Sequence, residues 1–312
     1  MDQVTHTPAP CLQTGAPPGD TALRWVEECF GKGAEVRMVR PLPGGIAHAN
    51  HALLVETRSG SAHRLVLRRW TSRGSAPARR RYSAAFSPER EIAALALLAG
   101  CEIPTPALVA ADPAGAYCDL PALLITRLNG HPPRPSPDDL AEYLIQLAAA
   151  LLPVHALNGA STMPAYVPHN RLDMPLPPKH AQRPGLWERA YEIAARPAPE
   201  APARFIHRDY HADNTLWSYG RLTGVVDWSD TSSGPVAVDI ARMRRGLALC
   251  HGPMVADRFL SAFDQVSGGY THDPYWDVRT TLDLLPEDDT RLIDEAEVPL
   301  YENYLAPLLA QC

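Results

Sequence analysis

The sequence predicts an α+β fold with two lobes, a small N-terminal lobe built on an antiparallel sheet and a larger, mainly helical C-terminal lobe. Two observations support this prediction. Short apolar runs at residues 53–55 and 65–67 are separated by turn residues, as in paired strands. After Pro235, helical patterns dominate instead. Strands that precede helices, rather than alternating with them, favour an α+β plan.

Composition narrows the class of protein. The chain has 312 residues and a formal net charge of −6, which suits one large domain or two moderate ones and argues against a nucleic-acid-binding protein. No run approaches the ~18 apolar residues that span a bilayer, so we expect no membrane partner. The six cysteines form no C-x-x-C pair, which is typical of reduced thiols in the cytoplasm. Nothing decides between a monomer and a dimer.

The N-terminal part begins with a tail. Residues 1–20 are rich in Pro and Thr and lack the basic start and apolar run of a signal peptide, so we expect them to be flexible. Apolar residues at helical spacing predict a first helix over residues 21–30. An Arg-rich stretch at residues 73–81 is interpreted as a solvated loop. A further helix is predicted to begin at Ser87, with Pro88 at its first helical position.

The boundary between the lobes is expected at the turn formed by Asn129 and Gly130. This places the N-terminal lobe at residues 21–128 and the C-terminal lobe at residues 129–312. The second lobe opens with a capped helix whose apolar positions continue to residue 157. Residues 159–184 are Pro-rich and irregular, and long loops of this kind are often functional.

The residues that indicate chemistry follow an apolar run that ends at Ile206. Asp209 comes two residues after His207, Asn214 follows five residues later, and Asp227 comes after a short Gly turn. This H-x-D-x-x-x-x-N spacing with a second Asp is that of kinases. In such a site one Asp orients the attacking hydroxyl, while the Asn and the second Asp hold the metal that bridges the phosphates.

The β-rich runs on either side of residues 218–221 predict a hairpin. If Gly220 and Arg221 form the loop, in a type II′ turn, Asn214 stands directly opposite Asp227. Their Cβ atoms are then about 5 Å apart. An amide oxygen and a carboxylate at that distance can share a hard cation such as Mg²⁺. The sequence therefore predicts a magnesium site at Asn214 and Asp227.

With these motifs in place, the sequence resembles the aminoglycoside phosphotransferase family, whose members share a bilobal protein-kinase-like fold. The resemblance runs from about residue 44 into the C-terminal region. It implies that Asp209 is the catalytic Asp, that Asn214 and Asp227 are metal ligands, and that His207 supports the catalytic loop. By the same resemblance, Asp239 is a buried residue that braces this loop from the following helix.

The resemblance also implies a nucleotide-binding set in the N-terminal half. Arg68 resembles the basic residue of the third strand, which contacts the phosphates, although the family pattern has Lys. Glu91 resembles its ion-pair partner. Residues 124–128 resemble the hinge whose backbone meets a purine edge. The full nucleotide-binding set is Gly44, Gly45, Arg68, Glu91, Thr126 and Leu128.

The activity implied by the resemblance is transfer of a phosphoryl group from ATP or GTP to a hydroxyl of a small molecule, with Mg²⁺ as cofactor. An antibiotic of the aminoglycoside, macrolide or peptide type is the expected acceptor. A metabolite such as an amino alcohol, a sugar or homoserine is the alternative, because a fold does not determine a substrate. The acidic run at residues 287–289 is interpreted as a solvated face, or as a surface that attracts a cationic acceptor.

Two interpretations from other classes stay open. A catalytically silent nucleotide-binding module has the same fold but usually lacks one of the three residues Asp209, Asn214 and Asp227, all of which are present. His207, Asp209, His211 and Asp213 alternate along the chain. They would form the zinc site of a hydrolase if their side chains converged with a further ligand.

Overall fold

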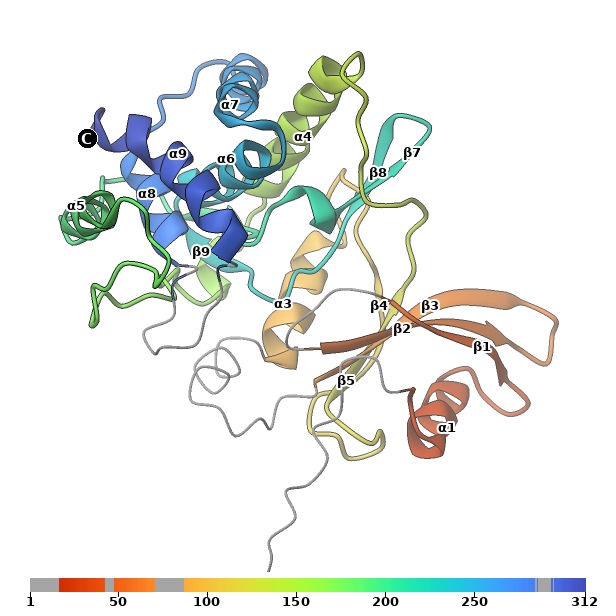
Figure 1. The fold of residues 1–312 in the computed structure, drawn as a ribbon. Helices are drawn as coiled ribbons and strands as arrows, with labels where there is room; N and C mark the ends of the chain where they lie inside the picture. Colours follow the sequence, from red (N-terminus) through yellow and green to blue (C-terminus); the bar gives the residue numbers. More distant parts are fainter. Residues whose placement is uncertain (1–16, 43–47, 71–86, 284, 286–292, 294) are drawn as a thin grey trace, which may run out of the picture. The chain divides into compact units, whose positions relative to one another are not determined.

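The computed structural model describes residues 17–42, 48–70, 87–283, 285, 293 and 295–312 (Figure 1). The chain divides into two compact units. The first consists of Met1–Pro88 and Leu108–Arg127, and the second of Glu89–Ala107 and Leu128–Cys312. Residues 89–107, expected in the N-terminal lobe, thus pack with the second unit.

The first unit contains an antiparallel sheet of five strands among the described residues, in the order β1-β2-β3-β5-β4. In the middle of the sheet, Leu67 pairs with His51 on one side and with Leu124 on the other. The antiparallel sheet predicted from the short apolar runs is therefore confirmed. The strands are β1 (Glu35–Pro41), β2 (His48–Glu56), β3 (Ala62–Trp70), β4 (Leu108–Asp112) and β5 (Ala122–Thr126).

Helix α1 (Asp20–Cys29) covers part of this sheet. Its buried residues Ala22, Trp25 and Val26 have the i, i+3, i+4 spacing of one helical face. They join Leu53, Leu65 and other strand residues in one hydrophobic cluster. The predicted helix over residues 21–30 is confirmed with slightly shifted ends.

The second unit is mainly helical (Figure 1). Helix α6 lies at its centre, where it packs against α7, α8 and α9, while α4 packs against α7. No helix among the described residues is long and apolar enough to cross a bilayer. The helices are α3 (Pro88–Leu98), α4 (Leu140–His155), α5 (Pro184–Ala194), α6 (Ala237–His251), α7 (Pro253–Ser267), α8 (Tyr275–Leu282) and α9 (Val298–Leu309).

Short strands position the loops of the second unit. Strand β6 (Arg204–Ile206) pairs with β9 (Ser232–Gly234), and β7 (Thr215–Ser218) pairs with β8 (Arg221–Val225) as a hairpin. Between β6 and β7 the chain forms the loop of residues 207–211 and the 3₁₀ turn η2 (Ala212–Asn214). The candidate residues Asp209 and Asn214 therefore lie in the connection between β6 and β7, two strands that belong to different two-stranded sheets.

The predicted register of the β7–β8 hairpin is wrong. The loop residues are Tyr219 and Gly220, both with positive φ (49° and 71°), as a type I′ turn requires, and Ser218 pairs with Arg221. A bulge between Leu216 and Trp217 of β7 then shifts the register by one residue. Beyond it, the backbone amide of Val226 donates to the carbonyl of Asn214 at 2.9 Å. Asn214 is therefore opposite Val226, and Asp227 lies one residue beyond it.

Candidate active site

Asp239 holds the loop that carries Asp209. It is fully buried near the start of α6, and its carboxylate accepts hydrogen bonds from the backbone amides of His207 (2.9 Å) and Arg208 (2.6 Å). The same carboxylate contacts Nε2 of His155 on α4 at 2.9 Å. Because two consecutive amides are fixed by one carboxylate, the backbone leading into Asp209 is held by the helical core. The brace implied by the family resemblance is present.

Asp209 presents a partly exposed carboxylate, with 39% of its side chain accessible. Its Oδ1 accepts a hydrogen bond from Nε of Arg242 on α6 at 2.9 Å, and its Oδ2 lies 3.5 Å from Nε2 of His211. Burial opposes ionisation, but the charges of Arg242, His211 and His207 outweigh it, so the pKa of Asp209 lies well below its ordinary value. Asp209 is therefore ionised at neutral pH.

Asn214 is oriented by Asp209 itself. Its Nδ2 donates to the backbone carbonyl of Asp209 at 2.9 Å and lies 3.3 Å from its Oδ2. With the amide nitrogen engaged in this way, the amide oxygen of Asn214 is the atom left for a metal ion.

Asp227 has an unusual backbone conformation. Its φ of 64° lies in the left-handed region, which is rare for residues other than glycine and is often found at functional sites. Its Oδ1 accepts a hydrogen bond from the hydroxyl of Ser229 at 2.8 Å. The next residue, Trp228, is fully buried and donates from its indole to the carbonyl of Val225. Trp228 thus anchors the backbone directly after the strained residue.

His207 connects the two loops. Its Nε2 contacts the carbonyl of Val226 at 3.0 Å, and its ring lies 4.4 Å from the ring of Trp228. The side chain is buried. His207 therefore fixes the loop of Asp209 against the chain segment that carries Asp227.

Comparison with known families identifies the class of protein. The sequence matches the model of the phosphotransferase enzyme family, APH, over residues 39–275. The matched region covers more than half of the chain and includes most of the sheet and the loops described above. The chain belongs to this family. It is a phosphotransferase enzyme, and the resemblance noted from its motifs is confirmed.

Solved structures of other phosphotransferases share the fold. A thermostable mutant of aminoglycoside phosphotransferase APH(4)-Ia, in a ternary complex with ADP and hygromycin B, has 15% sequence identity and a TM-score of 0.62, with 93% of this chain and 98% of that chain covered. Macrolide 2′-phosphotransferase type I has 16% identity and a TM-score of 0.58, with 95% and 98% covered.

A third structure, the apoenzyme of macrolide 2′-phosphotransferase MphH from Brachybacterium faecium, has 17% identity and a TM-score of 0.54, with 80% and 84% covered. A comparison with curated proteins finds no match. At these identities the structures establish the kinase-like fold, and they leave the acceptor of this phosphotransferase open.

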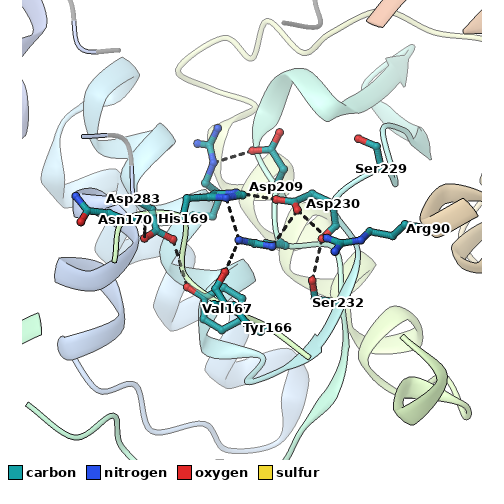
Figure 2. A network of polar contacts seen from close by, with 12 residues as sticks. Arg90, Tyr166, Val167, His169, Asn170, Asp209, Ser229, Asp230, Ser232 and Asp283 are labelled. Atoms are coloured by element: carbon teal, nitrogen blue, oxygen red, sulfur yellow. Dashed lines mark hydrogen bonds and ion pairs between the residues drawn. The ribbon is translucent and has the colours of Figure 1, made fainter. Parts of the chain in front are cut away.

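A buried polar network lies beside the loop of the phosphotransferase that carries Asp209 (Figure 2). Asp230 is at its centre, only 4% exposed, and bonds through Oδ1 to Nη1 of Arg208 (3.0 Å) and of Arg90 (3.3 Å). Its Oδ2 contacts Nε2 of His169 at 3.1 Å. One carboxylate therefore joins α3, the Pro-rich segment and the loop that carries Asp209.

Arg208 adopts a conformation that usually requires glycine, with a φ of 69°. Its side chain compensates by making several contacts. Besides Asp230, its Nη2 donates to the carbonyl of Val167 at 2.6 Å and to Nδ1 of His169 at 3.2 Å, and its guanidinium lies 5.2 Å from the ring of Tyr166. Arg208 thus holds part of the Pro-rich segment against the loop that carries Asp209.

The candidate nucleotide-binding residues are distributed over both units. Arg68 is buried in β3, where its Nη2 contacts Nδ1 of His48 at 3.2 Å and its guanidinium lies 5.9 Å from the ring of Trp70. Thr126 ends β5 opposite Leu65. Gly44 and Gly45 lie outside the described residues, as do the Arg-rich stretch and the acidic run at residues 287–289.

Two further members of this set belong to the second unit. Glu91 is buried in α3. Leu128 packs so closely on Gly224 of β8 that a Cβ atom there would lie 2.4 Å from Leu128 Cδ1. The predicted ion pair between Arg68 and Glu91 joins residues of different units and stays a prediction.

The zinc-site interpretation lacks a convergent set of ligands. In the part of the chain that the structure describes, no three His, Cys, Asp or Glu side chains come together as a metal site. His207 is instead turned to the carbonyl of Val226, while Asp213 is 82% exposed.

Sequence analysis did not identify several residues that contribute to this site. Arg208 stands inside the His-Arg-Asp motif and Asp230 follows Asp227 by three residues, so their positions were a signal that could have been used. Arg242 has the helical i+3 spacing from Asp239, which places both on one face of α6. His169 and Arg90 carried no such signal, because their partners are distant in sequence.

Proposed function

We propose that this phosphotransferase moves the γ-phosphoryl group of ATP or GTP to a hydroxyl group of a small molecule, and that the acceptor is an antibiotic of the aminoglycoside, macrolide or peptide type. The observation that carries the proposal is the partly exposed carboxylate of Asp209, held ionised in a braced loop beside Asn214. Family membership adds the class of reaction. The complex of the APH(4)-Ia mutant with ADP and hygromycin B supports both the donor and the acceptor class.

In this proposal Asp209 accepts a hydrogen bond from the acceptor hydroxyl and directs its oxygen at the γ-phosphorus. A new P–O bond forms as the bond between the γ-phosphorus and the bridging oxygen breaks, and ADP or GDP leaves. The low pKa of Asp209 makes it a weak base, so its contribution before bond formation is orientation. As the new P–O bond forms, the acceptor hydroxyl becomes acidic. Its proton then passes to Asp209 and from there to water.

Asn214 and Asp227 would hold Mg²⁺ through their side-chain oxygens. The residues fit this ion, because both donors are oxygen atoms and Mg²⁺ is commonly bound by one or two protein groups together with phosphates and water. When bound, Mg²⁺ would neutralise charge on the phosphates. The orientation of the Asn214 amide by Asp209 is the observation that supports this assignment.

Other parts of the chain complete the proposal. Arg68 would bind the nucleotide phosphates, and the backbone near Thr126 and Leu128 would meet the purine, as the family resemblance implies. We also place the enzyme in the cytoplasm, where the proposed donor is available and where thiols stay reduced, as those of Cys29, Cys101, Cys118, Cys250 and Cys312 are in the described residues.

The experiment that tests the proposal measures Mg²⁺-dependent release of ADP or GDP while acceptors are offered one at a time. The panel contains aminoglycosides, macrolides, cyclic peptide antibiotics and common hydroxylated metabolites, and an Asp209→Ala variant is the control. We expect an antibiotic to stimulate release by wild type, and the control to bind nucleotide without turnover. Stimulation by a metabolite alone would contradict the antibiotic assignment, and equal rates in the control would contradict the role of Asp209.

A further inference from the structure

Arg242 is the residue of α6 that reaches the candidate catalytic carboxylate. Its Nε donates to Oδ1 of Asp209 at 2.9 Å, and 21% of its side chain is exposed. Asp239 lies one helical turn earlier and binds the backbone amides that precede Asp209. One face of α6 therefore holds both the backbone and the side chain of the catalytic loop.

The contacts of Asp209 divide unequally between its two oxygens. Oδ1 receives the short, charge-assisted bond from Arg242, and bonds of this type are about twice as strong as neutral ones. Oδ2 has the longer contacts, at 3.3 Å to Nδ2 of Asn214 and 3.5 Å to Nε2 of His211. A carboxylate oxygen has lone pairs for more than one donor, so Oδ2 is the better placed to receive a hydroxyl.

We propose that Arg242 is a positioning residue for phosphoryl transfer, which fixes the Asp209 carboxylate so that Oδ2 meets the acceptor hydroxyl. This inference rests on the proposed function. The shape of the Arg side chain matters, because Nε and the two Nη atoms form a planar fork that sets the angle of its partner, whereas a Lys ammonium is a point charge. Arg242 acts through Asp209 and forms no bond with the acceptor.

Chemical rescue provides the test. We expect an Arg242→Ala variant to lose about 10- to 100-fold in kcat, because misplacing a reacting group by about 1 Å has effects of this size. The Michaelis constant for ATP should change less than about twofold, since Arg242 orients a group used in the transfer step. Added guanidinium should restore part of the lost rate, and an Arg242→Lys variant should lie between wild type and Arg242→Ala.

Two controls make the outcome specific. Arg189→Ala removes an arginine of α5 that is 47% exposed and pairs with Glu192, and it should leave kcat unchanged. Asp209→Ala should stay inactive with guanidinium present. Arg242→Ala with the kcat of wild type, or with a loss that guanidinium does not relieve, would overturn the role of Arg242 alone. Absence of transfer by wild type with every acceptor would overturn the proposed function and this role together.

Discussion

Nη1 of Arg208 lies 3.0 Å from Oδ1 of Asp230, and both side chains are almost fully buried. Removing one member of a buried ion pair destabilises the folded state, because the remaining group keeps its charge in the protein interior, where charges are poorly solvated. This pair also shares its carboxylate with Arg90 and His169. The stability of the fold around the loop of residues 207–211 should therefore depend strongly on Asp230.

We expect an Asp230→Asn variant to be less stable than wild type by about 3–5 kcal/mol, because the buried guanidinium of Arg208 loses its opposite charge. Urea unfolding at neutral pH measures the difference. Asp213→Asn is the matched control. The side chain of Asp213 is 82% exposed, so loss of its charge should change the free energy of unfolding little. Equal midpoints for Asp230→Asn and wild type would show that the network does not stabilise the fold.

Asp227 is expected to be needed for binding of the metal and nucleotide together. An Asp227→Ala variant should bind ATP more weakly in the presence of Mg²⁺, because one of the proposed oxygen ligands is lost. Titration calorimetry with Mg²⁺, and again with EDTA, separates the two contributions. In EDTA the variant and wild type should have similar affinities. An unchanged affinity with Mg²⁺ would rule out Asp227 as a metal ligand.

Because of Glu302, the free energy of unfolding of the helical unit should depend on pH in the acidic range. Glu302 is buried in α9, where its Oε1 accepts hydrogen bonds from the backbone amides of Gln182 and Arg183 and from the indole of Trp187 (2.9–3.1 Å). Burial alone would raise its pKa, but these bonds and the Arg183 guanidinium lower it below the ordinary 4.5. A lowered pKa means that the folded state favours the ionised form.

The resulting stabilisation is present above pH 4.5 and is lost as the pH falls through the lower pKa of the folded state. A Glu302→Gln variant should therefore be less stable than wild type at pH 7 by about 1–3 kcal/mol, and the difference should shrink in acid. Thermal and urea unfolding across this range provide the measurement. The exposed Glu192, replaced in a Glu192→Gln control, should show no such trend. A difference that is constant with pH would contradict the assignment.

Tyr219 occupies the first loop position of the β7–β8 hairpin with a positive φ, and its side chain is fully exposed. A type I′ turn prefers Asn at this position, so a Tyr219→Asn variant should be more stable by about 1 kcal/mol. The control Ser218→Asn, one residue earlier in β7, should give no gain, because Asn is unfavourable in strands. A gain in the control and none at residue 219 would indicate a different register.

The sequence identified the elements that depend on local patterns. Short apolar runs separated by turn residues predicted the antiparallel sheet, and apolar residues at helical spacing predicted α1. The hairpin register failed for a local reason: a non-glycine residue, Tyr219, adopts the left-handed conformation, and a bulge near Thr223 shifts the strand again. Turn rules expect glycine at a loop position with positive φ, so they do not predict that Tyr219 occupies the first loop position.

The position of Asp209 in the loop before the β7–β8 hairpin was predictable, because the motif is continuous, whereas contacts that depend on packing were not. Asp209 and Asn214 lie five residues apart, so the hydrogen bond between them depends only on local chain geometry. The partners of Asp230 come from α3 and from the Pro-rich segment, 140 and 61 residues away along the chain. Contacts at such separations follow from the assembled fold, and a single sequence carries no periodic signal for them.

Helix α6 has a consequence for how this enzyme should lose activity. One of its faces carries Asp239 and Arg242, which hold the loop of residues 207–211. Arg244 and Arg245 bond to Asp277 and to the carbonyl of Thr280 in α8. The carboxylate of Asp209 and the helical bundle are therefore both supported by α6. Heat inactivation should therefore coincide with melting of the helical bundle rather than precede it. A survey of damaging substitutions should find many in α6 and α8.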